Sequence, residues 1–223
     1  MPRDFNLNEF LMMMAALVIC ITIHEFAHAY SAYRAGDDTA KLKGRVSLNP
    51  LDHLDPFGTI MMIVTTYSGF GFGWGKPVPV NPMRMRHPRW DNLMVSLWGP
   101  LSNILLAAVV GTLLRVIVWL THTSTVPALH SSVMVNVVTF LFLITMINIG
   151  LAIFNLIPVA PLDGSHIISA LLPYESARRY DYFMARYGML VFFGLIFLGA
   201  DLLPAIIGPP AKLLMRLFTG VPL

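Results

Sequence analysis

One stretch near the start of the chain limits what the whole chain can fold into. Residues 10–33 form an apolar run that contains the sequence HEFAH at residues 24–28. At about 1.5 Å per residue, a helix of this length crosses a hydrocarbon core of about 30 Å. His24 and His28 then lie one turn apart on one helix face, the spacing at which two imidazoles reach the same metal ion. Glu25 beside them is placed to move a water proton, so the stretch predicts metal chemistry at membrane depth.

The composition supports a membrane protein over the alternative that HEFAH is a chance match on a soluble helix. Of the 223 residues, 56% are hydrophobic and 12% are charged, whereas soluble domains carry about 25% charged residues. The net charge is +3, but the basic residues lie between apolar runs and form no long cluster, which favours membrane orientation over nucleic-acid binding. The single cysteine, Cys20, excludes an intramolecular disulfide, and we expect a buried packing thiol rather than a fourth metal ligand.

The apolar runs predict an all-α polytopic membrane protein, folded as a single integral-membrane domain over residues 1–223. Four spanning helices are expected, at about residues 10–34, 93–120, 132–158 and 188–207. Between the last two spans, a short helix is expected over 165–173 and a charged connector over 174–187. A short amphipathic helix is expected at the C-terminus, after Pro209-Pro210.

Residues 57–75 are also apolar but contain different residue types from the other apolar runs. β-Branched residues cluster there, and glycine recurs at every second position from Gly69 to Gly75, which favours a strand-like backbone. We expect the segment to be re-entrant, returning before Lys76, because this places eleven Lys and Arg residues in the loops on one side against three on the other. The positive-inside rule makes the crowded side cytoplasmic, so the site is expected nearer the cytoplasmic face.

Two histidines do not complete a catalytic zinc site, which usually has three protein ligands and a water. Asp163 is a candidate third ligand, because two prolines unwind the chain after the span 132–158 and Gly164 lets the backbone turn there. The alternative from the residues alone is equally good, since an aspartate before a short helix is frequently its N-cap. His166 is a further candidate, although a surface role suits it better, and His53 is expected to be hydrogen-bonded structure.

Two motifs, in this order within apolar helices, carry a family resemblance: HEFAH, and NLIPVAPLDG at residues 155–164. The chain resembles the site-2 protease family of intramembrane zinc metalloproteases, in its compact prokaryotic branch without PDZ or CBS domains. Further runs fit that branch: GRVSLNP at 44–50, HLDPFG at 53–58, KPVPVNP at 76–82 and GPLSN at 99–103. The resemblance covers residues 23–165.

The resemblance implies a ligand set and a reaction. One zinc ion per chain would be held by His24, His28 and Asp163, and Glu25 would act as the general base. Two asparagines are implied as well. Asn155 would contact the substrate or the developing oxyanion, and Asn103 would help shape the site where substrate binds.

The implied function is hydrolysis of peptide bonds in the transmembrane segments of membrane proteins, as in regulated intramembrane proteolysis. The expected partners are a transmembrane protein or peptide substrate and the lipid bilayer, with no nucleic acid, in a multi-pass protein of the cell membrane. The edge of the segment 57–75 could pair with an extended substrate. Two alternatives stay open: a membrane metal transporter, and a catalytically silent relative that binds client proteins.

Overall fold

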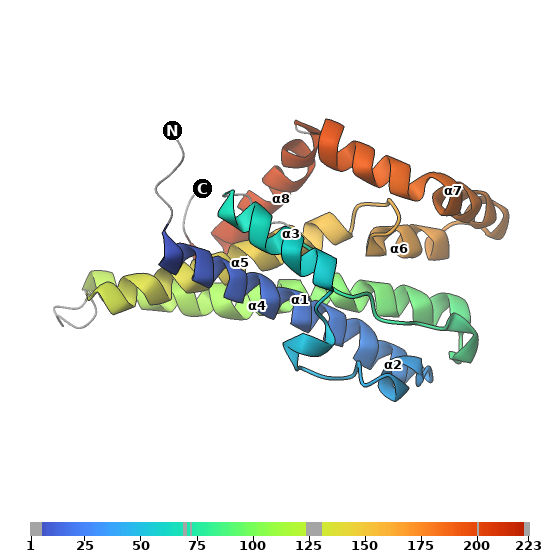
Figure 1. Ribbon diagram of the computed structural model, residues 1–223, viewed down its shortest axis with the longest axis horizontal. Coiled ribbons are helices and arrows are strands. Elements are labelled where there is room, and N and C mark those ends of the chain that lie inside the picture. Colours follow the sequence, from blue (N-terminus) through green and yellow to red (C-terminus); the bar gives the residue numbers. More distant parts are fainter. Residues whose placement is uncertain (1–5, 69–70, 72, 124–130, 200, 221–223) are drawn as a thin grey trace.

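The computed structural model describes residues 6–68, 71, 73–123, 131–199 and 201–220, and most of them are helical (Figure 1). The helices are α1 (Leu7–Ala35), α2 (Thr39–Leu42), α3 (Pro56–Tyr67), α4 (Pro88–Thr123), α5 (Ser132–Asn155), α6 (Asp163–Leu171), α7 (Tyr174–Leu198) and α8 (Leu202–Thr219), with 3-10 turns at Pro50–Asp52 and Pro82–Arg84. Within those ranges there is no strand, only an isolated bridge between Leu54 and Gly75. The all-α class is confirmed.

Among the described residues, five helices are long and apolar enough to cross a membrane: α1, α4, α5, α7 and α8. This is one more than the four expected, and the expected span 188–207 is wrong. In its place, α7 ends at Leu198 and α8 begins at Leu202. The expected connector 174–187 is the first half of α7, where a helix satisfies the backbone while the polar side chains stay exposed. The expected C-terminal helix is part of α8, which runs through both prolines.

Helix α1 carries the HEFAH sequence, and its two ends are defined by local chemistry. The side chain of Asn6 accepts hydrogen bonds from the backbone N–H groups of Asn8 and Glu9 and so caps the start. Gly36 ends the helix in the left-handed conformation, at φ 109°, which glycine adopts without steric cost. The helix between these caps is 29 residues long, so residues 24–28 lie within its second half.

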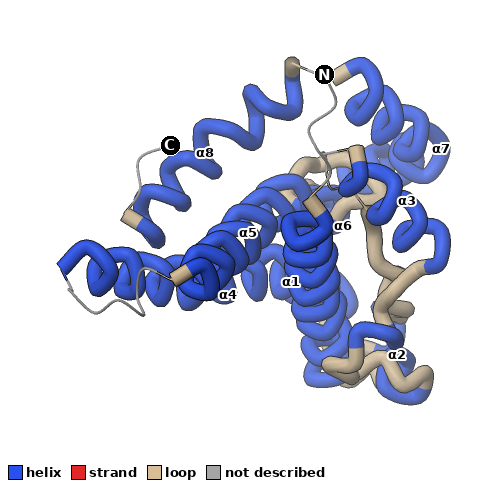
Figure 2. The backbone as a smooth tube through the Cα atoms, turned by 60° about the vertical axis from the view of Figure 1, so that its left-hand side comes forward, coloured by secondary structure: helices blue, strands red, loops and turns tan. Residues whose placement is uncertain are grey.

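Helices α1, α4 and α5 lie side by side and form the centre of the molecule (Figure 1), while α7 and α8 stand outside them (Figure 2). The centre is built on small side chains. Ala16 and Cys20 of α1 pack on Ile144 of α5, and Ala107 of α4 is fully buried with Met215 of α8. In lipid, the hydrophobic effect does not drive helices together, so small residues stabilise the contact by letting the helices approach closely. The expectation that Cys20 is a buried packing thiol is confirmed.

The strand-like reading of residues 57–75 is wrong, because residues 56–67 form helix α3. Asp55 caps the helix, accepting from the backbone N–H of Gly58 at 2.8 Å, and Pro56 occupies its first position. At 12 residues the helix is about 18 Å long, too short to cross a hydrocarbon core. The chain nevertheless returns to its starting point, because Leu54 and Gly75 form a bridge.

Helix α6 is docked against the first turns of α4, and this contact sets the position of Asp163. Ile167 and Ala170 of α6 pack on Leu93 of α4. The guanidinium of Arg89 donates from Nε to the carbonyl of Ala170, at 2.8 Å. The same side chain also donates to the carbonyl just beyond α6, so it satisfies carbonyl groups at the C-terminal end of the helix that have no partner within it. These contacts hold α6 against α4.

Candidate metal centre

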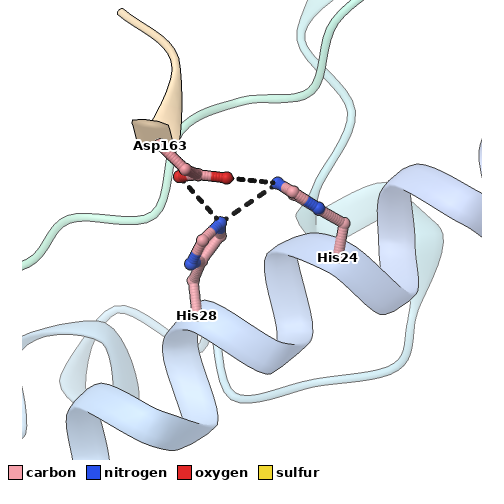
Figure 3. Close-up of side chains that lie close together, drawn as sticks. All are labelled: His24, His28 and Asp163. Atoms are coloured by element: carbon pink, nitrogen blue, oxygen red, sulfur yellow. Dashed lines mark hydrogen bonds and ion pairs between the residues drawn. The ribbon is translucent and has the colours of Figure 1, made fainter. Parts of the chain in front are cut away.

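Three side chains converge between α1 and α6 (Figure 3). His24 and His28 project from one face of α1, and their Nε2 atoms are 3.0 Å apart. Asp163, the first residue of α6, directs one carboxylate oxygen to each of them, with Oδ2 3.2 Å from Nε2 of His24 and Oδ1 3.2 Å from Nε2 of His28. Ligand atoms about 2.0–2.1 Å from one tetrahedral zinc ion would be about 3.4 Å apart. The spacing therefore fits a shared ion.

The two imidazoles are oriented by the partners of their other nitrogen atoms. Nδ1 of His28 lies 2.8 Å from the carbonyl oxygen of Val95, which can only accept, so Nδ1 carries the hydrogen. Nδ1 of His24 lies 2.6 Å from Oδ1 of Asn103. With both hydrogens on Nδ1, both Nε2 lone pairs face the point where the carboxylate also arrives. Such outer partners are typical of metal-ligating histidines.

The side chains of His24, His28 and Asp163 need a cation between them to be stable at these distances. Two lone pairs and a carboxylate within hydrogen-bond distance of one another repel, and Oδ2 of Asp163 is buried without a hydrogen-bond donor. A cation between the three groups would relieve this repulsion and pair with the buried carboxylate oxygen. Nitrogen and oxygen ligands of this kind suit zinc.

Two glycines make room for this arrangement. A methyl group on Gly99 of α4 would lie 2.3 Å from Nε2 of His28, so a bare backbone must pass beneath the two imidazoles. A methyl group on Gly164 would lie 2.3 Å from the carbonyl oxygen of Leu156, where the chain after α5 turns tightly into α6. The turn brings Asp163 to the histidines. The N-cap of α6 is Leu162, so the alternative that Asp163 serves as the cap is not what the structure shows.

Glu25 faces a different neighbour from the two histidines. Its Oε2 atom accepts a hydrogen bond from the backbone N–H of Val78 at 3.2 Å, in the extended segment 76–80. Arg45, a buried residue, holds that segment in place by donating to the carbonyl groups of Pro77, at 3.2 Å, and Lys76. Burial lowers the pKa of Arg45, and the negative charge of Glu25 opposes that effect. The sequence analysis did not single out Arg45 or Gly99, although both fall within motifs that carry the family resemblance.

Both of the expected asparagines have hydrogen-bond partners within the protein. Asn103 is fully buried behind His24, so it supports the imidazole, and the expected substrate contact at Asn103 finds no support. Asn155 is the last residue of α5, and its side-chain amide donates to the carbonyl of Leu151 at 2.9 Å. His166 is exposed and outside the three-residue cluster, whereas His53 is fully buried with Nε2 2.7 Å from a carbonyl oxygen.

The sequence of this chain is similar to those of known peptidases. The profile of peptidase family M50 matches residues 12–199. The chain is 37% identical over 211 residues to YwhC of Bacillus subtilis, which carries the name of a zinc metalloprotease, and the match covers 94% of this chain and 91% of YwhC. No solved structure matches.

Two further relatives are the Rip2 proteins of mycobacteria, which carry the same kind of name. The Mycobacterium tuberculosis protein is 27% identical over 195 residues, covering 86% of this chain and 69% of its own length. The Mycolicibacterium smegmatis protein is 27% identical over 172 residues, covering 76% of this chain and 60% of its own length.

Proposed function

Because this chain belongs to peptidase family M50 and is a zinc metalloprotease, we propose that it hydrolyses peptide bonds within the transmembrane segments of membrane proteins. The observation that carries the proposal is the convergence of His24 and His28 of the membrane-length helix α1 with Asp163 of the short helix α6. A soluble peptide would have to enter this layer, whereas a transmembrane segment already lies in it. The M50 family and relatives named as zinc metalloproteases support an enzyme over the two alternatives, a metal transporter and a catalytically silent relative.

Three residues would hold the metal: His24, His28 and Asp163. When bound there, zinc supplies Lewis acidity, which polarises a carbonyl group and acidifies water. The Asn103 side chain and the Val95 carbonyl, which bond the Nδ1 atoms of His24 and His28, keep both imidazoles in the tautomer that can bind the metal through Nε2. No rearrangement of the imidazoles is then needed when substrate arrives. The buried setting also excludes bulk water from the charges, so each interaction is stronger than it would be at an exposed surface.

Glu25 would be the general base. It would take a proton from water and deliver it to the leaving nitrogen of the scissile peptide bond. Its contact with the N–H of Val78 keeps the carboxylate beside the segment 76–80 and off the metal ligands. A carboxylate that is not a ligand keeps its lone pairs for proton transfer, which suits this role.

Asn155 would stabilise the developing oxyanion, a contact worth about 3 kcal/mol in other hydrolases. Its side chain would first have to release the carbonyl of Leu151 and turn toward the site. The position at the end of α5 makes this possible, because the chain unwinds directly after it and then forms the turn that leads to Asp163.

We place the site nearer the cytoplasmic face of the cell membrane. The loops that follow α1 and precede α4 lie at the same end of the molecule as α6 (Figure 1), and they carry basic residues such as Lys41, Lys43, Arg84 and Arg86. Basic loops are retained on the cytoplasmic side. A substrate helix cut there would release its cytoplasmic part, which is the outcome that regulated intramembrane proteolysis requires.

Cleavage by the purified full chain tests the proposal. The chain in detergent is incubated with a transmembrane peptide, with and without a zinc chelator, and products are identified by mass spectrometry. We expect wild type to cleave within the apolar segment, the chelator to stop it, and Glu25→Gln to be inactive with its zinc retained. Glu9→Gln, an exposed change on the same helix, is the matched control and should cleave like wild type. Cleavage by Glu25→Gln at the wild-type rate would contradict the proposal.

A further inference from the structure

A buried chain of side-chain amides connects α5 to the candidate metal centre. Asn148 of α5 and Asn103 of α4 are both fully buried. The Nδ2 atom of Asn148 lies 2.8 Å from the carbonyl oxygen of Ile144, and its Oδ1 atom lies 2.6 Å from Nδ2 of Asn103. On its far side, Asn103 presents Oδ1 to Nδ1 of His24 at 2.6 Å. Two hydrogen bonds between side chains therefore separate α5 from a metal ligand on α1.

The direction of the hydrogen bonds between these amides is fixed at the Asn148 end. The carbonyl oxygen of Ile144 can only accept, so the Asn148 amide must present its NH₂ group there and its oxygen to Asn103. Asn103 must then donate from Nδ2, and the carbonyl of Cys20, 3.2 Å from the same atom, requires the same orientation. The oxygen of Asn103 is left facing His24, where it accepts the Nδ1 hydrogen. The lone pair of Nε2 is consequently the one that faces the metal site.

The two histidines differ in how they are held. His28 bonds directly to a backbone carbonyl, that of Val95, and a carbonyl of the helix backbone cannot flip. His24 bonds to an amide side chain, and an amide can present either its oxygen or its NH₂ group. If Asn103 turned over, its NH₂ group would face Nδ1 and favour the tautomer with hydrogen on Nε2, which leaves no lone pair on Nε2 for the metal. Only His24 therefore depends on the amide chain.

We propose that Asn148 is a positioning residue of the metal centre: it fixes the orientation of Asn103 and thereby the ligating tautomer of His24. The inference rests on the metal site of the proposed function. Asn148 is on the far side of Asn103 from His24, so it reaches the imidazole through the amide of Asn103, while its Nδ2 atom also lies 2.9 Å from Sγ of Cys20 on α1. Removing an outer partner of a metal ligand typically weakens metal binding about 10- to 100-fold, and we expect Asn148 to act in that range.

An isosteric pair of variants separates hydrogen bonding from packing. Asn148→Thr keeps a hydroxyl that can donate to the i−4 carbonyl of Ile144 and accept from Asn103, so it preserves the direction of the chain. Asn148→Val has the same shape without either group. Asn148→Ala makes the same deletion with less bulk, should the valine variant fail to fold. Asn136→Val, the same change at an exposed position of α5, is the matched control.

The experiment measures the zinc dissociation constant of the purified full chain by competition with a chelator. We expect Asn148→Val and Asn148→Ala to weaken zinc binding about 10- to 100-fold, Asn148→Thr to recover most of the loss, and Asn136→Val to match wild type. In a His24→Ala background, Asn148→Val should cause no further loss, whereas in a His28→Ala background it should still do so. A purely structural role would lower affinity equally in both backgrounds.

Two results would overturn the inference: equal zinc affinity in the threonine and valine variants, or equal losses in the two histidine backgrounds. Cleavage of a transmembrane peptide by the same wild-type preparation keeps this outcome apart from the proposed function. If wild type cleaves the peptide but all Asn148 variants bind zinc as tightly as wild type, only the role of Asn148 is rejected. If the variants show the predicted losses of zinc affinity but wild type does not cleave, only the proposed function is rejected.

Discussion

The carboxylate of Glu25 accepts a hydrogen bond from the backbone N–H of Val78, 3.2 Å away, so the expected general base is held by an extended segment 53 residues further along the chain. That segment contains prolines at positions 77 and 79, which have no N–H group, so Val78 supplies the donor between them. The position of Glu25 thus depends on how firmly the segment 76–80 is held.

Arg45 tests this dependence. Arg45→Met keeps the length of the side chain but removes the donors to the carbonyl groups of Lys76 and Pro77. We expect kcat for peptide cleavage to fall about 10- to 100-fold because Glu25 loses its fixed geometry, with zinc affinity unchanged. Arg84→Met, which breaks an exposed ion pair with Asp38, is the control and should change kcat and zinc affinity little. Loss of zinc from Arg45→Met would show that Arg45 supports the metal site and not the base.

Gly99→Ala tests the close approach of α4 to the imidazoles. The added methyl group would lie 2.3 Å from Nε2 of His28, and relieving such a clash typically costs about 1–3 kcal/mol. We expect zinc binding to weaken about 10- to 100-fold, measured by chelator competition. Gly150→Ala is the matched control, because nothing lies within 4 Å of the added methyl group and alanine favours a helix. Equal zinc affinity in both variants would contradict the geometry described for Gly99.

Asn155→Ala tests the proposed oxyanion contact. We expect kcat to fall about 100-fold, as when one such donor is lost elsewhere, while zinc affinity and KM for a transmembrane peptide stay close to wild type. The split arises because a developing oxyanion exists only in the transition state. Asn136→Ala, on the same helix, should leave kcat unchanged. A wild-type kcat in Asn155→Ala would remove this residue from the mechanism.

Asp37 predicts a pH dependence of stability. Burial raises the pKa of its carboxyl, but hydrogen bonds from the N–H of Asn81 and from Thr39 outweigh burial and lower the pKa below its usual value. A lowered pKa in the folded state means that the carboxylate stabilises the fold above the unfolded pKa, about 3.9, and that this contribution is lost as pH falls through the folded value. Asp37→Asn should therefore lower Tm most at neutral pH, and the difference from wild type should shrink below about pH 4.

The exposed neighbour Asp38 is the control for this measurement. Its carboxylate pairs with Arg84 at the surface, so Asp38→Asn should change Tm little at any pH. A difference between Asp37→Asn and wild type that stays constant down to pH 3 would contradict the role of the Asp37 carboxylate.

The parts of the site that the sequence predicts well are local. His24 and His28 are four residues apart on one helix, so their common direction follows from helix geometry alone. Asp163 is different, because its position depends on how α6 docks on α4, and the residues alone left its role open between ligand and helix cap. The family resemblance decided in favour of a ligand, and the structure brings its carboxylate to both imidazoles.

The wrong expectation for residues 57–75 came from weighing β-branched residues above a helix start signal. Asp55 followed by Pro56 is such a signal, and in lipid a helix satisfies its own backbone, whereas an isolated strand does not. In the sequence, Asn148 is a polar residue within an apolar run, with no local motif around it. Its partner lies on another helix, 45 residues away in the chain, and no local rule pairs them.

The position of zinc in the zinc-loaded chain, measured by anomalous diffraction at the zinc absorption edge, tests the proposed metal centre directly. We predict one zinc ion per chain within about 2.0–2.2 Å of Nε2 of His24, Nε2 of His28 and a carboxylate oxygen of Asp163. A zinc ion bound elsewhere, or one bound by the two histidines with the carboxylate of Asp163 turned away, would contradict it.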